Sequence, residues 1–224
     1  IPQYPQLLYP ASKQGMGEHM ITAIEALERL RTGNQRFVDN LTTRTPTTQA
    51  QLSGLSAAQA PFAIILGCSD ARVPAEIVFD QGLGDLFVIR VAGNIVAPSQ
   101  VGSVEFAAAQ FGTPLVVVLG HTNCGAIDAT IAELGRPSAD QSPNLHSIVD
   151  RIRPSIQPLL LTELINHPEL LRATAVRANI QASTSHLRHG SQILEQLIQE
   201  KGLLVVGAEY SLETGIVDFY DAVH

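Results

Sequence analysis

Three apolar runs constrain the fold of this chain more than any other feature. They are PFAIILGCSD (61–70), DLFVIRVAGN (85–94) and PLVVVLGHTNCG (114–125), and each ends abruptly in small or polar residues. Unbroken runs of Val, Ile and Leu are typical of strands buried on both faces of a parallel sheet. Because Trp is absent and aromatic residues make up only 5% of the chain, we expect an aliphatic core.

Segments with helical patterns follow each of these runs, at 74–80, 102–111 and 125–134. Pro74 suits the first turn of the first of these helices. Strands that alternate with helices predict an α/β fold with right-handed crossovers. A long helical region over 144–201 is expected to break near Pro154, Pro158 and Pro168.

The two ends of the chain complete the predicted fold. The C-terminal segment 203–223 reads as two strands joined at Glu213-Thr214-Gly215, which adds a fourth parallel strand and an antiparallel edge strand. Residues 18–40 predict a long amphipathic N-terminal helix, and 41–60 predict a loop or a short helix. Residues 1–17 are expected to form an extended arm, either a loose terminus or a segment packed on a partner subunit. We interpret 1–224 as a single domain with a mostly parallel central sheet flanked by helices.

Charge and hydropathy argue against two classes of partner. The net charge is −7 and no cluster of Lys and Arg stands out, so we expect no nucleic acid to bind. No stretch approaches the roughly 20 apolar residues of a membrane helix, so we expect no membrane span. Two cysteines do not make a disulfide framework, and they favour a reducing compartment such as the cytoplasm. Nothing at the start of the given sequence reads as a signal peptide, but it begins at Ile1 and not at Met, and a targeting segment upstream of it would leave export open.

The only two cysteines lie at corresponding places in the predicted sheet. Cys68 and Asp70 follow the first strand, and His121 and Cys124 follow the third. Carboxyl ends of adjacent parallel strands lie about 4.8 Å apart at one edge of the sheet, so these side chains converge if the first and third strands are neighbours. Either cysteine alone could be a buried apolar thiol. Together with the imidazole they suit Zn²⁺, and three protein ligands would leave the fourth position open to water, as in a catalytic site.

The segments CSDARVPAE (68–76), FDQGLGDLFVIRVAGN (79–94) and VLGHTNCGAI (118–127) together resemble the β-class carbonic anhydrases. One small difference is Ala71, where Ser is common in the family. The resemblance extends over about residues 20–220. It implies the reversible hydration of CO₂ to bicarbonate and a proton by a zinc-bound hydroxide.

The resemblance also implies the roles of individual residues. Cys68, His121 and Cys124 correspond to the zinc ligands of the family. Asp70 and Arg72 correspond to its catalytic ion pair, in which the carboxylate stays ionised and orients the nucleophile. Asp70 becomes a fourth zinc ligand only in a closed form of the site.

Two further residues are expected to bind substrate, the first of them from the resemblance. Gln81 matches a residue that hydrogen-bonds substrate from the partner subunit, although by itself it reads as an exposed loop residue. Gly125 is expected to let the backbone after Cys124 pass close to the metal, although a tight turn would also explain a glycine there. The family pairs subunits with each active site at the seam, so a homodimer or a higher oligomer such as a tetramer is expected.

One subset of the family has an inhibitory bicarbonate pocket, with a Trp three residues before the first zinc cysteine. Ile65 stands at that place here. Arg90 matches the arginine of the pocket and Tyr210 could match its tyrosine. Without the Trp we expect no such pocket and an open resting form.

Other readings of the sequence remain. A related hydrolase acting on CS₂ or COS would share the metal ligands, and a non-catalytic zinc protein could dispense with Asp70, Arg72 and Gln81. His186 and His189 lie three residues apart on a predicted helix. They are either solvated side chains or part of a second metal site.

Overall fold

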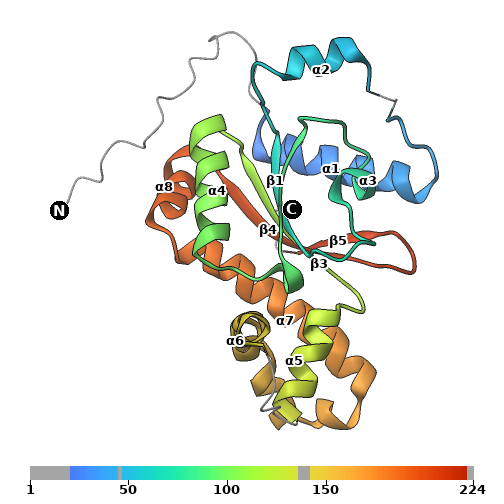
Figure 1. Cartoon of the computed structure of the whole chain (residues 1–224), viewed down its shortest axis with the longest axis vertical. Helices are drawn as coiled ribbons and strands as arrows, with labels where there is room; N and C mark the ends of the chain where they lie inside the picture. Colours follow the sequence, from blue (N-terminus) through green and yellow to red (C-terminus); the bar gives the residue numbers. More distant parts are fainter. Residues whose placement is uncertain (1–20, 45–46, 136–141, 221–224) are drawn as a thin grey trace, which may run out of the picture.

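A five-stranded sheet forms the centre of the molecule in the computed structural model, which describes residues 21–44, 47–135 and 142–220 (Figure 1). The strand order is β2-β1-β3-β4-β5. The strands are β1 (Ala63–Gly67), β2 (Leu86–Arg90), β3 (Leu115–His121), β4 (Leu204–Tyr210) and β5 (Val217–Tyr220). The first four run parallel and β5 pairs antiparallel with β4. This arrangement confirms the predicted sheet, including its antiparallel edge, and it meets the condition that β1 and β3 are neighbours.

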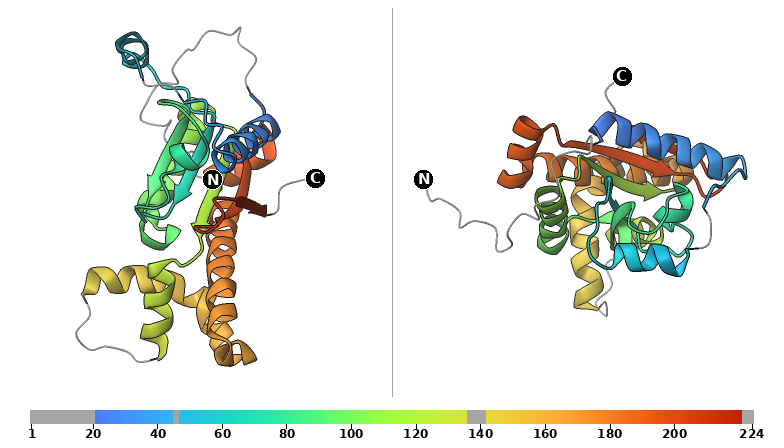
Figure 2. Two further views of the ribbon diagram at one scale, coloured as in Figure 1. Left: turned by 90° about the vertical axis from the view of Figure 1, so that its right-hand side faces the viewer. Right: turned by 90° about the horizontal axis from the view of Figure 1, so that it is seen from above.

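Helices cover both faces of the sheet (Figures 1 and 2). One face packs against α1 (Ala23–Val38) and α3 (Ala75–Val78), and the other against α4 (Pro98–Phe111), α7 (Pro168–His189) and α8 (Gln192–Lys201). Helices α5 (Gly125–Gly135) and α6 (Pro143–Ile156) lie beyond the carboxyl ends of the strands. The remaining elements are α2 (Gln49–Leu55) and the 3₁₀ turns η1 (Ala92–Asn94), η2 (Gln157–Leu161) and η3 (Glu163–Asn166).

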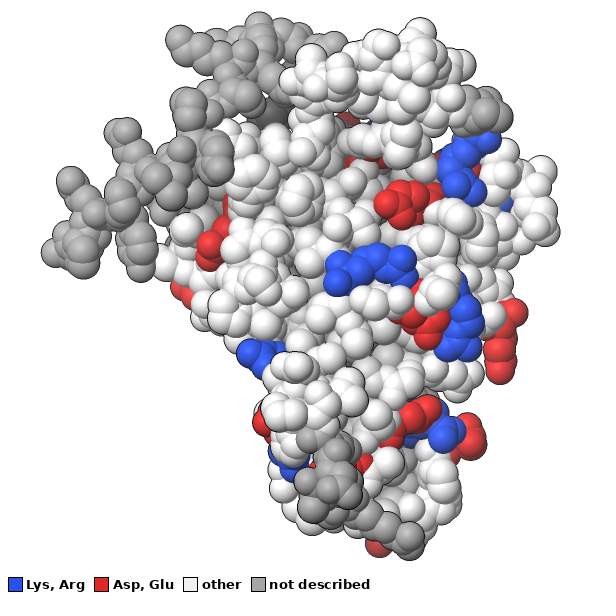
Figure 3. All heavy atoms as spheres, viewed as in Figure 1, with Lys and Arg blue, Asp and Glu red and all other residues white. Residues whose placement is uncertain are grey.

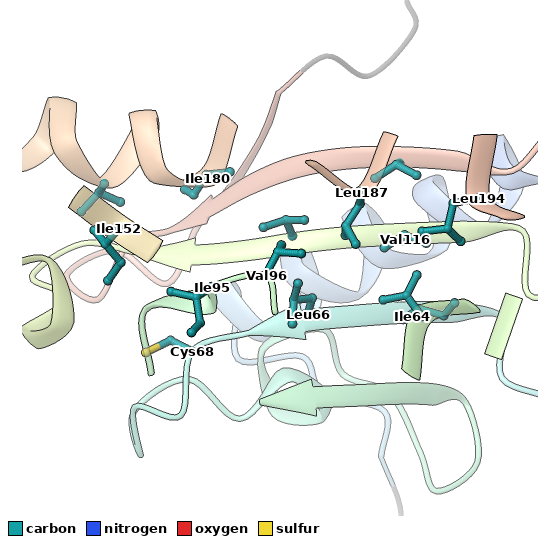
Figure 4. Packing of buried hydrophobic residues seen from close by; sticks show 14 of the residues in the cluster. Ile64, Leu66, Cys68, Ile95, Val96, Val116, Ile152, Ile180, Leu187 and Leu194 are labelled. Atoms are coloured by element: carbon teal, nitrogen blue, oxygen red, sulfur yellow. The ribbon is translucent and has the colours of Figure 1, made fainter. Parts of the chain in front are cut away.

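Burial on both faces explains why the strands read as unbroken apolar runs. Ile64 and Leu66 of β1 point into the core shared with α4, α7 and α8, together with Val116 of β3 (Figure 4). Ile65 and Val117, the alternate residues, point into the core shared with α1 and α3. Successive side chains of a strand face opposite sides, so a strand covered on both sides has no position that favours a polar residue.

Two helices begin at other residues than expected. Helix α1 begins at Ala23, where Thr22 and Glu25 form a capping box, and the predicted arm over 1–17 lies outside the described residues. Helix α4 begins at Pro98, four residues earlier than expected.

The break predicted near Pro154 is wrong, whereas Pro158 and Pro168 each stand in the first turn of a new helical element. Pro154 lies within α6, close to its C-terminal end. A proline removes only one backbone hydrogen bond there, and Ile152 and Ile156 are both 0% exposed. Burial of these isoleucines keeps the last turn of α6 helical.

Two glycines let α7 lie very close to the sheet. A Cβ atom added at Gly120 of β3 would lie 2.5 Å from Cδ1 of Ile180, and one added at Gly207 of β4 would lie 2.8 Å from its Cγ2. Ile180 is fully buried between α7 and these strands (Figure 4). Larger residues at the two glycine positions would push α7 away from the carboxyl ends of β3 and β4.

The surface shows no segregation of charge on the face drawn in Figure 3, where basic and acidic side chains of the described residues are interspersed. Within the described ranges, no helix combines the length and the apolar character needed to cross a bilayer.

Candidate metal centre

Cys68, His121 and Cys124 meet at the carboxyl edge of the sheet. Their ligand atoms all lie within 4.8 Å of one another, and all three residues are buried. Cys68 directly follows β1, His121 ends β3, and Cys124 precedes α5. The parallel pairing of β1 with β3 brings these segments together, as the sequence predicted. In the part of the chain that the structure describes, no second group of this kind is found, and His186 and His189 belong to none.

The ring of His121 is oriented by a single hydrogen bond. Its Nδ1 lies 2.9 Å from the carbonyl oxygen of Thr122, which can only accept, so Nδ1 carries the proton. In the neutral imidazole Nε2 is then an acceptor, and it has no hydrogen-bond partner among the described residues although the side chain is 0% exposed. A buried polar atom without a partner is costly, and a metal ion would satisfy it.

The two cysteines share one proton. A hydrogen bond from Cys124 lowers the pKa of the Cys68 thiol to about 4 against the opposing effect of burial, with further help from the N–H of Gly93. The same thiolate, together with burial, raises the pKa of Cys124. The Gly93 N–H donates to Cys68 Sγ over 3.3 Å. Two sulfur atoms, one of them already a thiolate, and one imidazole form a donor set that fits Zn²⁺, whose binding would displace the remaining thiol proton.

Asp70 and Arg72 form a bidentate ion pair beside this cluster. Arg72 donates from Nε to Oδ1 over 2.9 Å and from Nη2 to Oδ2 over 2.7 Å. The guanidinium holds the pKa of Asp70 well below its usual range, and the carboxylate in turn raises the pKa of Arg72. Asp70 Oδ2 lies 3.8 Å from Nε2 of His121, so the carboxylate borders the cluster without belonging to its ligand group.

Comparison with known proteins places this geometry in a family. The carbonic anhydrase family profile matches residues 63–217, which contain the whole cluster and the ion pair. The chain is 34% identical over 193 residues to "Carbonic anhydrase 2" of Mycobacterium tuberculosis, which covers 86% of this chain and 90% of that protein. It also superposes on the β-carbonic anhydrase CcaA with a TM-score of 0.68 and 27% identity, over 87% of each chain. The chain belongs to the β-class carbonic anhydrases.

The fold alone is shared with a more distant group of solved structures. A solved chain of a tetrameric β-carbonic anhydrase from Sordaria macrospora matches with a TM-score of 0.68 at 22% identity, over 76% of this chain and 86% of that one.

In this carbonic anhydrase, Arg90 holds the loop after β1, which carries two residues of the candidate site, by hydrogen bonds to its backbone. Its Nε donates to the carbonyl oxygen of Cys68 over 3.0 Å, and its Nη2 donates to that of Asp70 over 2.5 Å. Arg90 therefore ties the end of β2 to the loop that carries both residues. Tyr210 of β4 lies opposite His121 of β3 in the sheet, but its ring packs in the core on the α1 side, near Phe37.

Gln81 is not brought to the metal cluster within this chain. It is buried, and its Nε2 donates to the carbonyl oxygen of Phe79 over 2.7 Å while its Oε1 accepts from Arg29 over 3.0 Å. It lines a separate cavity of about 860 Å³ between α1, α2 and the loop before β2, and no residue of the cluster lines that cavity. At Gly125, an added Cβ would meet no atom of the described chain within 4 Å, so the structure shows no close backbone contact there.

Sequence reasoning assigned no role to Gly93 or to Thr122. Thr122 is tied to the β4–β5 connection twice: its N–H donates to the Tyr210 carbonyl oxygen, and its Oγ1 accepts from the N–H of Leu212, both over 3.0 Å. These bonds fix the carbonyl group that orients His121. The position of Thr122, directly after a predicted ligand at a strand end, was the only available signal.

Proposed function

We propose that this carbonic anhydrase hydrates CO₂ reversibly to bicarbonate and a proton at a zinc ion held by Cys68, His121 and Cys124. The observation that carries the proposal is the convergence of three buried ligand atoms within 4.8 Å, one of them an unpartnered imidazole nitrogen. A bound zinc ion supplies a Lewis acid that makes water a nucleophile near neutral pH. The side chains around the ion would orient the water and bind the substrate.

Asp70 is proposed to accept a hydrogen bond from the reacting water. Because Arg72 keeps the carboxylate ionised, Asp70 can only accept, and it therefore selects the orientation in which the water's lone pair faces CO₂. The bidentate ion pair with Arg72 also restrains the carboxylate from turning onto the metal. This restraint supports an open resting form, in which Asp70 is not a fourth ligand.

Gln81 is proposed to act in the active site of a neighbouring subunit. Phe79 accepts one hydrogen from its Nε2, which leaves the second for a substrate oxygen. Its position in a cavity apart from the cluster supports a homo-oligomer in which one subunit completes the site of another. The solved Sordaria macrospora enzymes are tetrameric, which supports the same view. Light scattering of the purified protein tests this, and a monomer at assay concentration would contradict it.

Stopped-flow measurement of CO₂ hydration, combined with metal analysis, tests the proposed chemistry. We expect one zinc per chain and a rate that Asp70→Asn lowers about 10²-fold or more without loss of zinc. The matched control is Asp150→Asn, which removes an exposed carboxylate that also pairs with an arginine but lies on α6. Full activity of Asp70→Asn would remove Asp70 from the mechanism, and absence of zinc would overturn the proposal. The same preparation assayed with CS₂ and COS tests the related hydrolase function.

A further inference from the structure

Helix α7 reaches the metal centre through the short turn η1. Asn179 and Ser183 lie one helical turn apart on the same face of α7 and are 3% and 6% exposed. Asn179 Nδ2 donates to the carbonyl oxygen of Gly93 over 2.8 Å, and Ser183 Oγ donates to that of Asn94 over 3.1 Å. Both acceptors belong to η1, which lies 86 or more residues earlier in the chain. Thus α7 fastens two successive peptide groups of this turn.

The turn holds the N–H group that faces the Cys68 sulfur. Gly93 has φ 69° and ψ 20°, in the left-handed region, and its N–H donates to Cys68 Sγ over 3.3 Å. A Cβ atom at Gly93 would lie 2.7 Å from Cδ1 of Ile152 and 3.0 Å from Cβ of Ala126. The two torsion angles of Gly93 relate the direction of its N–H to that of its C=O. Restraint of the carbonyl by Asn179 therefore restrains the N–H that points at sulfur.

We propose that Asn179 is a positioning residue for the metal centre: it keeps the Gly93 N–H on the Cys68 thiolate. The inference rests on the zinc site proposed above. Asn179 does not face the ligand group itself and acts through the backbone of η1. An N–H donor reduces the negative charge on a thiolate and fixes its direction, so it tunes both the affinity of the site and the donor strength of that sulfur.

Stability alone does not favour an asparagine at this place. Asn has a poorer helix propensity than Ala or Leu, and it stands in the interior of a 22-residue helix. Burial of its amide costs free energy unless the amide is hydrogen-bonded. The close approach of α7, allowed by Gly120 and Gly207, places the amide within reach of Gly93. The hydrogen bond to the Gly93 carbonyl oxygen is what offsets these two costs.

Two measurements on the holoenzyme and its cobalt form test the role of Asn179. Asn179→Ala is expected to weaken zinc binding about tenfold in chelator competition, at the lower end of the usual effect of residues outside the ligand shell. In the Co²⁺-substituted protein, the sulfur-to-metal charge-transfer band should move to longer wavelength, because the thiolate loses its N–H donor.

The control is Thr184→Val on the same helix, which deletes a buried hydroxyl whose hydrogen bond within the described residues goes to the Ile180 carbonyl oxygen. It should lower the melting temperature but leave zinc affinity within about twofold and the cobalt band unmoved. A folded Asn179→Ala protein with wild-type affinity and band position would overturn the inference. If Asn179→Ala does not fold, Asn179→Ser, whose hydroxyl is too short to reach Gly93, carries the same two outcomes. A wild-type protein that binds no zinc would instead refute the zinc site itself.

Discussion

Gly33 of α1 offers a sharp test of how this fold is held together, because two physical effects predict opposite signs for Gly33→Ala. Gly33 lies inside a 16-residue helix, where Ala is favoured over Gly by about 1 kcal/mol. However, a Cβ atom at this position would lie 1.9 Å from the carbonyl oxygen of Phe79 and 2.8 Å from Nε2 of Gln81. The first of these atoms belongs to the backbone and cannot rotate away.

The steric effect should win. Relief of a 1.9 Å contact requires α1 to move away from the end of α3 by more than 1 Å, since real Cβ atoms keep more than 3.0 Å from such neighbours. Asn34, the next residue, bonds to the Val78 carbonyl oxygen over 3.1 Å and to the Val217 N–H over 2.9 Å, and both bonds would be strained. Overpacking of a core typically costs 1–3 kcal/mol, and a fixed backbone neighbour places this case at the upper end. We expect a net destabilisation of about 2 kcal/mol after the helix propensity is subtracted.

Gly102→Ala in α4 is the matched control. Gly102 is exposed in the interior of a 14-residue helix, and an added Cβ would meet no described atom within 4 Å. The same substitution should therefore stabilise the protein there, by up to about 1 kcal/mol. Urea unfolding at equal protein concentration measures both variants, because the stability of an oligomer depends on concentration. A Gly33→Ala protein as stable as wild type would refute the reasoning that the α1–α3 contact is rigid.

Two further predictions concern acid and metal removal. Asp80 is 4% exposed, and although burial alone would raise its pKa, bonds from Thr43, Arg36 and Arg44 lower it from the ordinary value of 3.8. The ionised carboxylate thus stabilises the fold above about pH 4 and loses this contribution as the pH falls further. Asp80→Asn should therefore destabilise the protein most at neutral pH and least in acid. Urea titrations at several pH values measure this difference. Zinc extraction with a chelator should lower the unfolding free energy by about 2.7 kcal/mol, relative to protein at a zinc concentration 100 times the dissociation constant. Calorimetry should show that the unfolding temperature recovers when zinc is restored. An unchanged unfolding transition would contradict a zinc site in the folded state.

The sequence by itself determined the sheet and the composition of its metal centre. Continuous apolar runs are stable only as strands covered on both faces, so the parallel sheet followed from residues such as Ile64 and Val116. In a parallel sheet every carboxyl end lies at the same edge, so Cys68 and His121 could be placed at one edge from the sequence, and the neighbouring positions of β1 and β3 bring them together. The identity of the ligands needed only this local rule and the chemistry of the side chains.

Only the tertiary structure decided what supports those ligands. The bond from Asn179 to Gly93 joins groups 86 residues apart, and it depends on how closely α7 lies on the sheet. The same holds for Arg90, whose guanidinium reaches the carbonyl groups of the loop after β1, and for Gln81, which the fold buries in a cavity away from the cluster. Hydrogen bonds of this kind depend on distances of a few tenths of an ångström between packed elements, and no sequence pattern records such distances.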